Sequence, residues 1–373
     1  MEKQTPSDLK ELIQIVTSNS NKLNPKQICA VGKCLSVSDI NKCDGGISID
    51  LTKLNRVLKI NKKKQTVTVE SGITLHELNH QIAQHGLSLP NQTAIDDVSI
   101  GGAISTACHG TGKTSSFSSF VKNLQIVLSD GSLKKIDSSC PFFNSFQTSL
   151  GLLGIIYSVT LQCEPLFYLL KTISFMDFPT FIQNCNDLYE NNDHFQVHVN
   201  VHSDTVQTVC WNRCSQETQD SQPSYETLSF YKFDPNDKGP FSEFAIPIQK
   251  LSNVLKDVCP FLDNHCEFDD LTIRFVLSEK SLLSPSFSDN KNDVIVHLAF
   301  TSSIENSIHL FQELEDMLIT KHNARPHWSK TNFLNSHKIN FLYHSNYQQF
   351  LSVKKRVDPN NWFLNDLFIN QKN

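Results

Sequence analysis

The segment Ser99-Ile-Gly-Gly-Ala-Ile-Ser-Thr-Ala-Cys-His-Gly-Thr-Gly112 contains four glycines, four hydroxyl side chains and one histidine. Glycines let the backbone approach a bulky ligand closely, and their free N–H groups can bind phosphate oxygens. The segment is not a Walker loop, because the Gly-Lys-Thr at residues 112–114 lacks the first glycine at the required spacing. It is not the G-x-G-x-x-G turn of dinucleotide-binding folds either. The residues alone leave two interpretations open, a cradle for a cofactor and a glycine-rich surface loop.

The sequence around this segment predicts a first region of about 165 residues that mixes helices and strands. Thr74-Leu-His-Glu77 has the form of a capping box, so a helix begins there, and Gly86 is expected to end it. Another helix is expected from Pro6 on. Strands are predicted at residues 28–31, 47–51 and 154–161, and hairpins at 56–70 and 124–136.

From residue 167 on, the pattern changes to that of a sheet with helices on one face. Residues 195–202 alternate strictly between apolar and polar side chains, as a half-buried strand does, and residues 294–298 read as a further strand. Helical patterns lie at residues 248–258 and 304–318, and residues 216–224 form the most loop-like stretch.

The composition limits the class of protein. A chain of 373 residues with 39% hydrophobic residues is long enough for two domains and too apolar to be disordered. Its formal net charge of −5 gives no general attraction to nucleic acid. Eleven cysteines without framework spacing, a polar start and the absence of a long apolar run predict a reduced, cytoplasmic protein with neither a signal peptide nor a transmembrane segment.

Six stretches of the sequence resemble, in order, the motifs of one enzyme family: residues 30–39, 99–112, 151–164, 243–247 with 273–285, 325–330 and 358–365. The family is that of the FAD-linked oxidases of the vanillyl-alcohol oxidase type, in the sugar-1,4-lactone branch that includes gulonolactone oxidase, arabinonolactone oxidase and plant galactonolactone dehydrogenase. The resemblance implies an α+β fold with a PCMH-type FAD-binding domain at residues 1–165 and an α+β cap (substrate) domain at 166–321. A C-terminal segment, residues 322–373, would return to the flavin.

The resemblance implies an FAD enzyme that oxidises the carbon next to the carbonyl of a sugar-1,4-lactone. Hydride would pass to flavin N5 while a proton leaves the hydroxyl, and oxygen or another acceptor would reoxidise the flavin. A small-molecule lactone or polyol is the expected substrate, and no metal is expected. The residues expected to contact FAD are Gly32, Lys33, Cys34, Leu35, Ser36, Gly101, Gly102, Thr106, His109, Gly110, Thr111, Gly154 and Ile156.

Three residues are expected to act on the substrate. Lys330 would stabilise the reduced flavin by its charge, the alternative being a solvated lysine. Arg274 stands in the apolar alternation of residues 271–276, where a guanidinium needs a partner; the resemblance implies that it binds the substrate, and the alternative is an ion pair on the exposed face of the sheet. His327 would accept the hydroxyl proton or position the substrate, the alternative being a packing histidine.

The chain departs from the family pattern at three places. Leu35 stands where animal and fungal oxidases have the histidine that binds flavin covalently, so non-covalent FAD is expected, as in the plant dehydrogenases. Lys33 and Cys34 occupy glycine positions, where their side chains would crowd the pyrophosphate. The second departure is Thr272, which replaces the glutamate of many members on the same face of the strand as Arg274. It predicts a different substrate or impaired activity. The third departure is the expected lack of the leading segment at the N-terminus.

His194, His198 and His202 share one face of a predicted strand and invite comparison with a metal site. Gln196 and Asn200 lie on that face as well, so a solvated or substrate-facing surface is favoured.

The cysteines at positions 210, 214, 259 and 266 lack the paired spacing of zinc sites. Cys108 and His109 are not expected to pair, because neighbours on an extended chain point to opposite faces. Two other functions stay open: a non-catalytic paralogue that binds flavin or a partner, and an oxidase of a related polyol.

Overall fold

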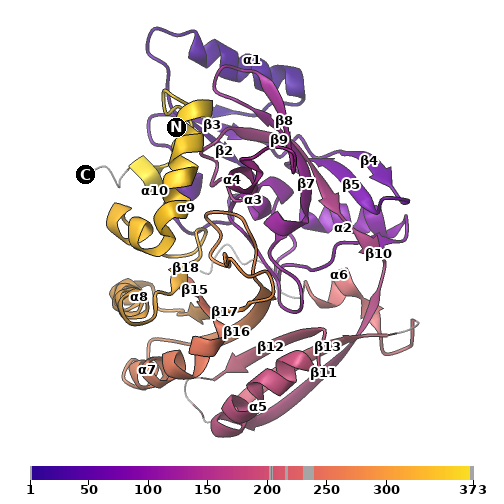
Figure 1. The fold of residues 1–373 in the computed structure, drawn as a ribbon, viewed down its shortest axis with the longest axis vertical. Coiled ribbons are helices and arrows are strands. Elements are labelled where there is room, and N and C mark those ends of the chain that lie inside the picture. The colour runs from indigo at the N-terminus through magenta and orange to yellow at the C-terminus, as the bar shows by residue number, and fades with distance from the viewer. Residues whose placement is uncertain (1, 201–202, 204, 215–216, 230–238, 370–373) are drawn as a thin grey trace.

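The two predicted hairpins and the strand predicted at residues 154–161 meet in one antiparallel sheet (Figure 1). Its order is β4-β5-β9-β7-β8, formed by β4 (Val57–Asn61), β5 (Thr66–Glu70), β7 (Val121–Val127), β8 (Leu133–Asp137) and β9 (Ile155–Gln162). Both predicted hairpins are therefore confirmed, and β9 lies between them.

The computed structural model describes residues 2–200, 203, 205–214, 217–229 and 239–369.

Helices cover one face of this sheet because their apolar stripes match its buried side chains. α2 (Leu75–Ala83) and α3 (Ile100–Ser105) pack Leu78 and Ile104 into the same core as Val69 and Val159. The capping box is confirmed, since the Glu77 N–H donates to the Thr74 hydroxyl and the Glu77 carboxylate accepts from the Thr74 N–H.

The prediction that Gly86 ends this helix places the end too late. α2 ends at Ala83, and the His85 and Gly86 N–H groups then bond to carbonyls three residues earlier. This tighter turn brings the chain to Gly86, which adopts the expected positive φ of +72°.

A small parallel sheet lies on the other side of the first region. Its order is β1-β3-β2, formed by β1 (Glu2–Gln4), β2 (Ile28–Val31) and β3 (Ile47–Asp50), and α1 (Leu9–Ser20) packs against it. The remaining short elements of this region are η1 (Asp39–Asn41), β6 (Leu87–Ser88), η2 (Phe117–Phe120), α4 (Phe143–Gln147) and β10 (Glu164–Pro165).

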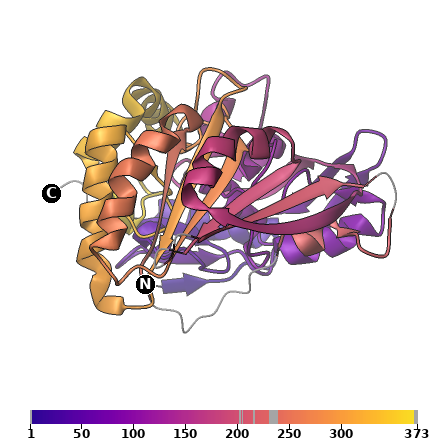
Figure 2. The ribbon, with the colours of Figure 1, turned by 90° about the horizontal axis from the view of Figure 1, so that it is seen from below.

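The second region is an eight-stranded antiparallel sheet with its three long helices on one face, as the pattern after residue 167 predicts (Figure 2). The order is β14-β11-β13-β12-β16-β17-β15-β18. The strands are β11 (Tyr168–Asp177), β12 (His194–Val199), β13 (Thr205–Arg213), β14 (Gln222–Pro223), β15 (Phe241–Pro247), β16 (Asp270–Leu277), β17 (Val294–Thr301) and β18 (Arg325–Pro326). The helices are α5 (Phe178–Glu190), α6 (Ser224–Thr227), α7 (Leu251–Asp263) after η3 (Ile248–Lys250), and α8 (Ile308–His322) after η4 (Glu305–Ser307). Of these, α5, α7 and α8 supply the apolar cover.

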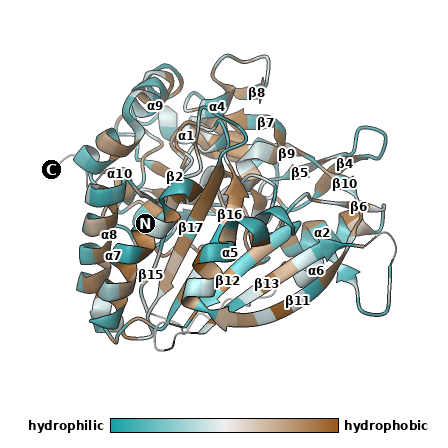
Figure 3. Cartoon of the chain, turned by 60° about the horizontal axis from the view of Figure 1, so that its bottom comes forward, coloured by the Kyte–Doolittle hydropathy of each residue, from teal (hydrophilic) through white to brown (hydrophobic). Residues whose placement is uncertain are grey.

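Strand alternation gives this sheet two different faces. Val197, Ile273 and Leu298 point to the helices and belong to a buried apolar core, and much of β16 and β17 is hydrophobic (Figure 3). The residues between them, among them His198 and Thr272, point to the opposite side, toward the first region. His202 and part of the stretch 216–224 lie outside the described residues.

The C-terminal segment leaves the second region and packs on the first. After β18 it forms α9 (Ser336–Val357), kinked at His344, and α10 (Asp366–Ile369), which lie beside the first region in Figure 1. The Ile28 N–H bonds to the Trp362 carbonyl at 2.6 Å. No helix among the described residues is both long enough and apolar enough to span a membrane.

A hydrogen bond from His194 joins the sheet of the second region to the glycine-rich segment. The Nδ1 of His194 donates to the carbonyl oxygen of Thr111 at 2.7 Å, and the side chain is buried. Burial lowers the pKa of His194 from 6.5 to about 4. The histidine is therefore neutral in the folded protein at pH 5, where in the unfolded chain it is protonated.

We expect the free energy of unfolding to fall as the pH drops from 6.5 towards 4, because the unfolded chain then binds one proton more than the fold at His194. His194→Asn keeps a donor near Nδ1 and removes the titration. This variant should reduce the slope by up to ~1.4 kcal/mol per pH unit, measured by urea unfolding at several pH values. An unchanged slope would contradict the assignment.

Candidate active site

A cavity with a volume of about 480 Å³ lies where the first region, the polar face of the second sheet and the C-terminal segment meet. It reaches from the loop after β2, past α3 and the turn before β9, to β16 and residues 327–330. Its size is within the range of cofactor and ligand sites. The cavity brings together fourteen of the predicted site residues: Gly32, Lys33, Cys34, Leu35, Ser36, Gly101, Gly102, Thr106, His109, Gly154, Ile156, Arg274, His327 and Lys330.

Glycines bring the backbone close together on one wall of the cavity. A Cβ atom at Gly32 would lie 2.0 Å from the Ser99 hydroxyl, and one at Gly101 would lie 2.9 Å from the Cβ of Ser71. Only glycine fits at either position without displacing its neighbour. Both glycines therefore allow neighbouring segments to pack closely along this wall.

The loop after β2 contains a backbone position that favours glycine. Cys34 has a φ of +55° and its side chain is exposed. The left-handed conformation costs a residue with a Cβ about 1–2 kcal/mol. The departure from glycine at this position is thus tolerated at a cost in backbone energy.

Gly110 and Thr111 do not line the main cavity, although they were predicted to contact the cofactor. A Cβ at Gly110 would lie 2.1 Å from the Gln92 carbonyl oxygen, so this glycine permits close packing of two segments. The Thr111 hydroxyl accepts from the Phe275 N–H at 3.2 Å and donates to the Phe195 carbonyl. Gly110 therefore packs two segments of the first region together, and Thr111 joins the two regions beside the cavity.

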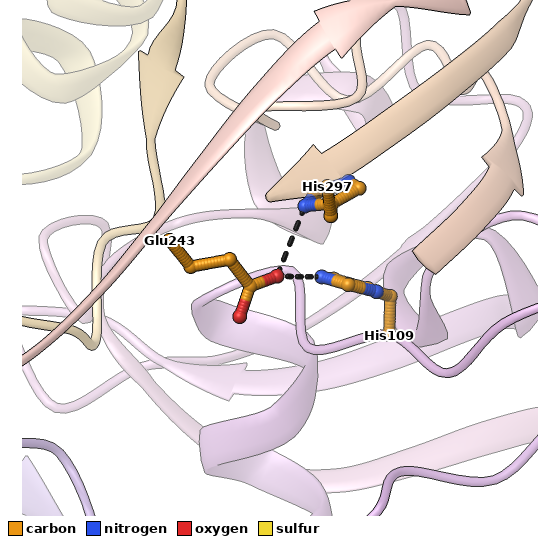
Figure 4. Close-up of side chains that lie close together, drawn as sticks. All are labelled: His109, Glu243 and His297. Atoms are coloured by element: carbon orange, nitrogen blue, oxygen red, sulfur yellow. Dashed lines mark hydrogen bonds and ion pairs between the residues drawn. The ribbon is translucent and has the colours of Figure 1, made fainter. Parts of the chain in front are cut away.

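A buried cluster of His109, Glu243 and His297 lies at the wall between the two regions (Figure 4). Glu243 Oε1 bonds to His109 Nε2 and lies 3.0 Å from His297 Nδ1. The Nδ1 of His109 donates to the carbonyl oxygen of Gly110 at 2.9 Å. His109 therefore connects the Glu243 carboxylate to the backbone of the glycine-rich segment.

The charges of this cluster follow from its surroundings. Burial alone would raise the pKa of the Glu243 carboxyl, but the neighbouring His109 and His297 hold it well below its ordinary value. Burial, reinforced by the nearby His109, lowers the pKa of His297 to about 4. Glu243 is therefore an anion at neutral pH, and His297 is neutral.

The same three residues offer metal-ligand atoms within 4.8 Å of one another. A metal at this place would have to displace the proton between His109 and Glu243. His297 Nε2 is also engaged, since it lies 2.7 Å from the Ser286 hydroxyl. The ligand atoms of the three residues thus already have hydrogen-bond or ion-pair partners.

Arg274 and Lys330 bring two cations into the cavity. The Arg274 Nε donates to the Gln196 side-chain oxygen at 3.0 Å, and no described residue accepts from its two Nη groups. The Lys330 Nζ lies 3.8 Å from the centre of the Phe241 ring. Burial lowers the pKa of both groups, although Glu243 opposes the shift.

His327 presents a donor to the cavity. Its Nδ1 accepts from the backbone N–H of Ser329 at 3.2 Å, so in the neutral ring the proton is on Nε2. Burial lowers the pKa of His327 to about 3, which keeps the ring neutral. This geometry is compatible with the predicted positioning role.

The site also contains Glu243, His297 and Asp270, which were not predicted as site residues. Glu243 and His297 are polar residues in otherwise apolar strands. That is the same signal that singles out Arg274, and it could have identified them.

The comparisons with known proteins agree with this arrangement. A family model described as "FAD binding domain" matches residues 4–137, and one described as "D-arabinono-1,4-lactone oxidase" matches residues 238–371. L-gulonolactone oxidase of Mus musculus is 26% identical, over 91% of this chain and 88% of the relative. L-gulono-1,4-lactone dehydrogenase of Mycobacterium tuberculosis is 26% identical, over 97% and 93%.

A solved structure shares the fold. Cholesterol oxidase from B. sterolicum has a TM-score of 0.84 at 13% identity, over 99% of this chain and 93% of the other. The chain thus has the predicted PCMH-type FAD-binding fold, and FAD is its cofactor. The cradle at Gly32 and Gly101, where no side chain fits, and the cavity volume are compatible with such a ligand.

Cys34→Gly should tighten FAD binding, because it removes a side chain that would crowd the pyrophosphate. It should also raise the free energy of unfolding by about 0.5–1 kcal/mol, because the relief of the left-handed strain exceeds the entropy cost of glycine. FAD titration and urea unfolding measure the two effects. Gln65→Gly is the matched control, since Gln65 has a φ of +50° in a turn remote from the cavity. The Gln65→Gly variant should show the same rise in the free energy of unfolding without a change in FAD affinity. Weaker FAD binding by Cys34→Gly would contradict this interpretation.

Proposed function

Because the chain belongs to the FAD-linked oxidases, in their sugar-1,4-lactone branch, we propose that it oxidises an aldono-1,4-lactone at the carbon next to the lactone carbonyl. FAD, when bound, supplies the hydride acceptor. Oxygen or another electron acceptor completes the cycle. One observation carries the proposal: Arg274 of β16 and the pair His327 and Lys330 of the C-terminal segment line a single glycine-walled cavity.

Arg274 binds the substrate. Its Nε is fixed by Gln196, and its two Nη groups remain available for the carbonyl or hydroxyl oxygens of a lactone. Burial makes each such hydrogen bond stronger than it would be in water, because less solvent competes for the donor.

Lys330 would stabilise the negative charge that the bound flavin acquires when it accepts the hydride. Its ammonium lines the cavity and is held over the Phe241 ring. A fixed cation in a site that excludes water stabilises such charge without reorganisation.

His327 and Glu243 share the handling of the hydroxyl group. The Nε2–H of His327 donates to a substrate oxygen and orients it. Glu243 is the ionised carboxylate at the inner wall, and it accepts a hydrogen bond from the substrate hydroxyl. This bond orients the hydroxyl, whose proton passes to solvent as the C–O bond becomes a carbonyl.

The proposal is tested by mixing the purified yellow protein with a panel of aldono-1,4-lactones and alditols without oxygen and recording flavin absorbance. At least one lactone should bleach the flavin. Lys330→Met should slow the bleaching at saturating lactone about 100-fold, because it loses a cation at the developing charge. Lys63→Met, in the exposed turn between β4 and β5, is the control and should react normally. Bound FAD that no lactone reduces would refute the proposal.

We also expect FAD to be held without a covalent bond, because Leu35 lines the cavity and has no nucleophilic atom. Acid precipitation should release all the flavin into the supernatant. Flavin fluorescence that stays with the polypeptide on a denaturing gel would show that another residue forms the bond.

A further inference from the structure

Polar side chains continue beyond Arg274 along the cavity-facing side of the second sheet. Asp270, Thr272 and Arg274 alternate along β16 and share one face. On the neighbouring β12, Gln196 pairs with Arg274 and His198 pairs with Thr272. Asp270, Thr272 and His198 all line the cavity. The lining of the cavity is therefore polar well past the groups that the reaction itself requires.

These side chains form a hydrogen-bonded chain with a single direction. The Arg274 Nε donates to the Gln196 side-chain oxygen, so the amide nitrogen of Gln196 faces His198 Nε2, at 2.6 Å. His198 Nε2 must then be the acceptor, and its Nδ1 carries the proton.

The chain ends on a carboxylate. His198 Nδ1 lies 3.1 Å from the Thr272 hydroxyl and donates to it, and that hydroxyl donates to Asp270 Oδ2 at 2.8 Å. The order of donors and acceptors thus runs from the arginine cation to the Asp270 anion. Each polar group between the two charges is satisfied.

The Asp270 end of this chain is open. The side chains of Asp270 and His198 are 38% and 30% exposed, whereas Thr272 is 8% exposed. No described residue donates a hydrogen bond to the Oδ1 of Asp270. A ligand can therefore approach a free carboxylate oxygen at the place where the cavity opens.

We propose that Asp270, Thr272 and His198 form a hydroxyl-binding subsite at the open end of the cavity, which holds the polyhydroxylated tail of the substrate remote from the oxidised carbon. The inference rests on the proposed function, because it assumes that a lactone ring lies at Arg274. A carboxylate accepts from hydroxyl groups, and its hydrogen bonds are stronger than those between neutral groups. Thr272 is about 7 Å from Arg274 along the strand, and the Asp270 carboxylate lies 2.8 Å from the Thr272 hydroxyl, so a short tail reaches from Arg274 to this subsite.

The test compares aldono-1,4-lactones of four, five and six carbons that share their ring configuration. They differ only in the tail, which is absent, CH2OH, or CHOH-CH2OH. In the unchanged protein, kcat/KM for anaerobic flavin reduction should rise at least 10-fold from the four-carbon to the six-carbon lactone. Asp270→Asn should reduce this ratio to within 3-fold, mainly through KM for the lactones that carry a tail.

Two further variants keep the test decisive. His198→Phe preserves the ring volume and removes both nitrogens, and it should lose the tail preference as Asp270→Asn does. Asp263→Asn makes the same change on the exposed end of α7 and should behave as the unchanged protein. FAD content and thermal unfolding verify that each variant is folded.

The outcomes separate the two proposals. If no lactone reduces the flavin, the proposed function is wrong. If lactones reduce it but the unchanged protein shows no tail preference, or Asp270→Asn and His198→Phe retain that preference, the function stands and the subsite is refuted.

Discussion

The carboxylate of Glu243 is a buried charge, and the hydrogen bonds and ion pairs that compensate it hold the site together. Its side chain bonds to His109 of the glycine-rich segment, and its backbone carbonyl accepts from the His327 N–H at 2.8 Å. One residue of β15 therefore joins the first region, the second sheet and the C-terminal segment. An unpaired buried carboxylate is strongly unfavourable, so the three parts are stable only in an arrangement that keeps this pairing. The cavity between them acquires its shape from the same requirement.

A second buried carboxylate secures the interface with neutral donors. Glu279 accepts hydrogen bonds from the hydroxyls of Ser116 and Ser118 in the first region and from Ser281 and Ser284 in its own. Hydroxyl donors compensate the desolvation of the carboxylate without bringing a counter-charge close to the cavity. The interface between the two regions is thus specified by directional bonds, which fix the relative position of catalytic groups more sharply than apolar packing does.

Local patterns in the sequence predict the strands, the hairpins and the capping box, because these depend on neighbours in the chain. Thr74 and Glu77 form their reciprocal bonds within a single turn, and the alternation around Val197 depends on one buried face. The position of Glu243 opposite His109 depends instead on the order β16-β17-β15, which no local pattern contains. The structure places two residues of the glycine-rich segment outside the cavity for a related reason. The chain leaves the cavity after His109, so Gly110 and Thr111 serve packing and interface contacts.

The departure at Thr272 acquires a meaning once the neighbouring strand is known. The anionic group is supplied two residues earlier on the same face by Asp270, and the Thr272 hydroxyl connects it to Arg274 through His198 and Gln196. Arg274 and Lys330 are then matched by two carboxylates, Glu243 at the inner wall and Asp270 at the opening.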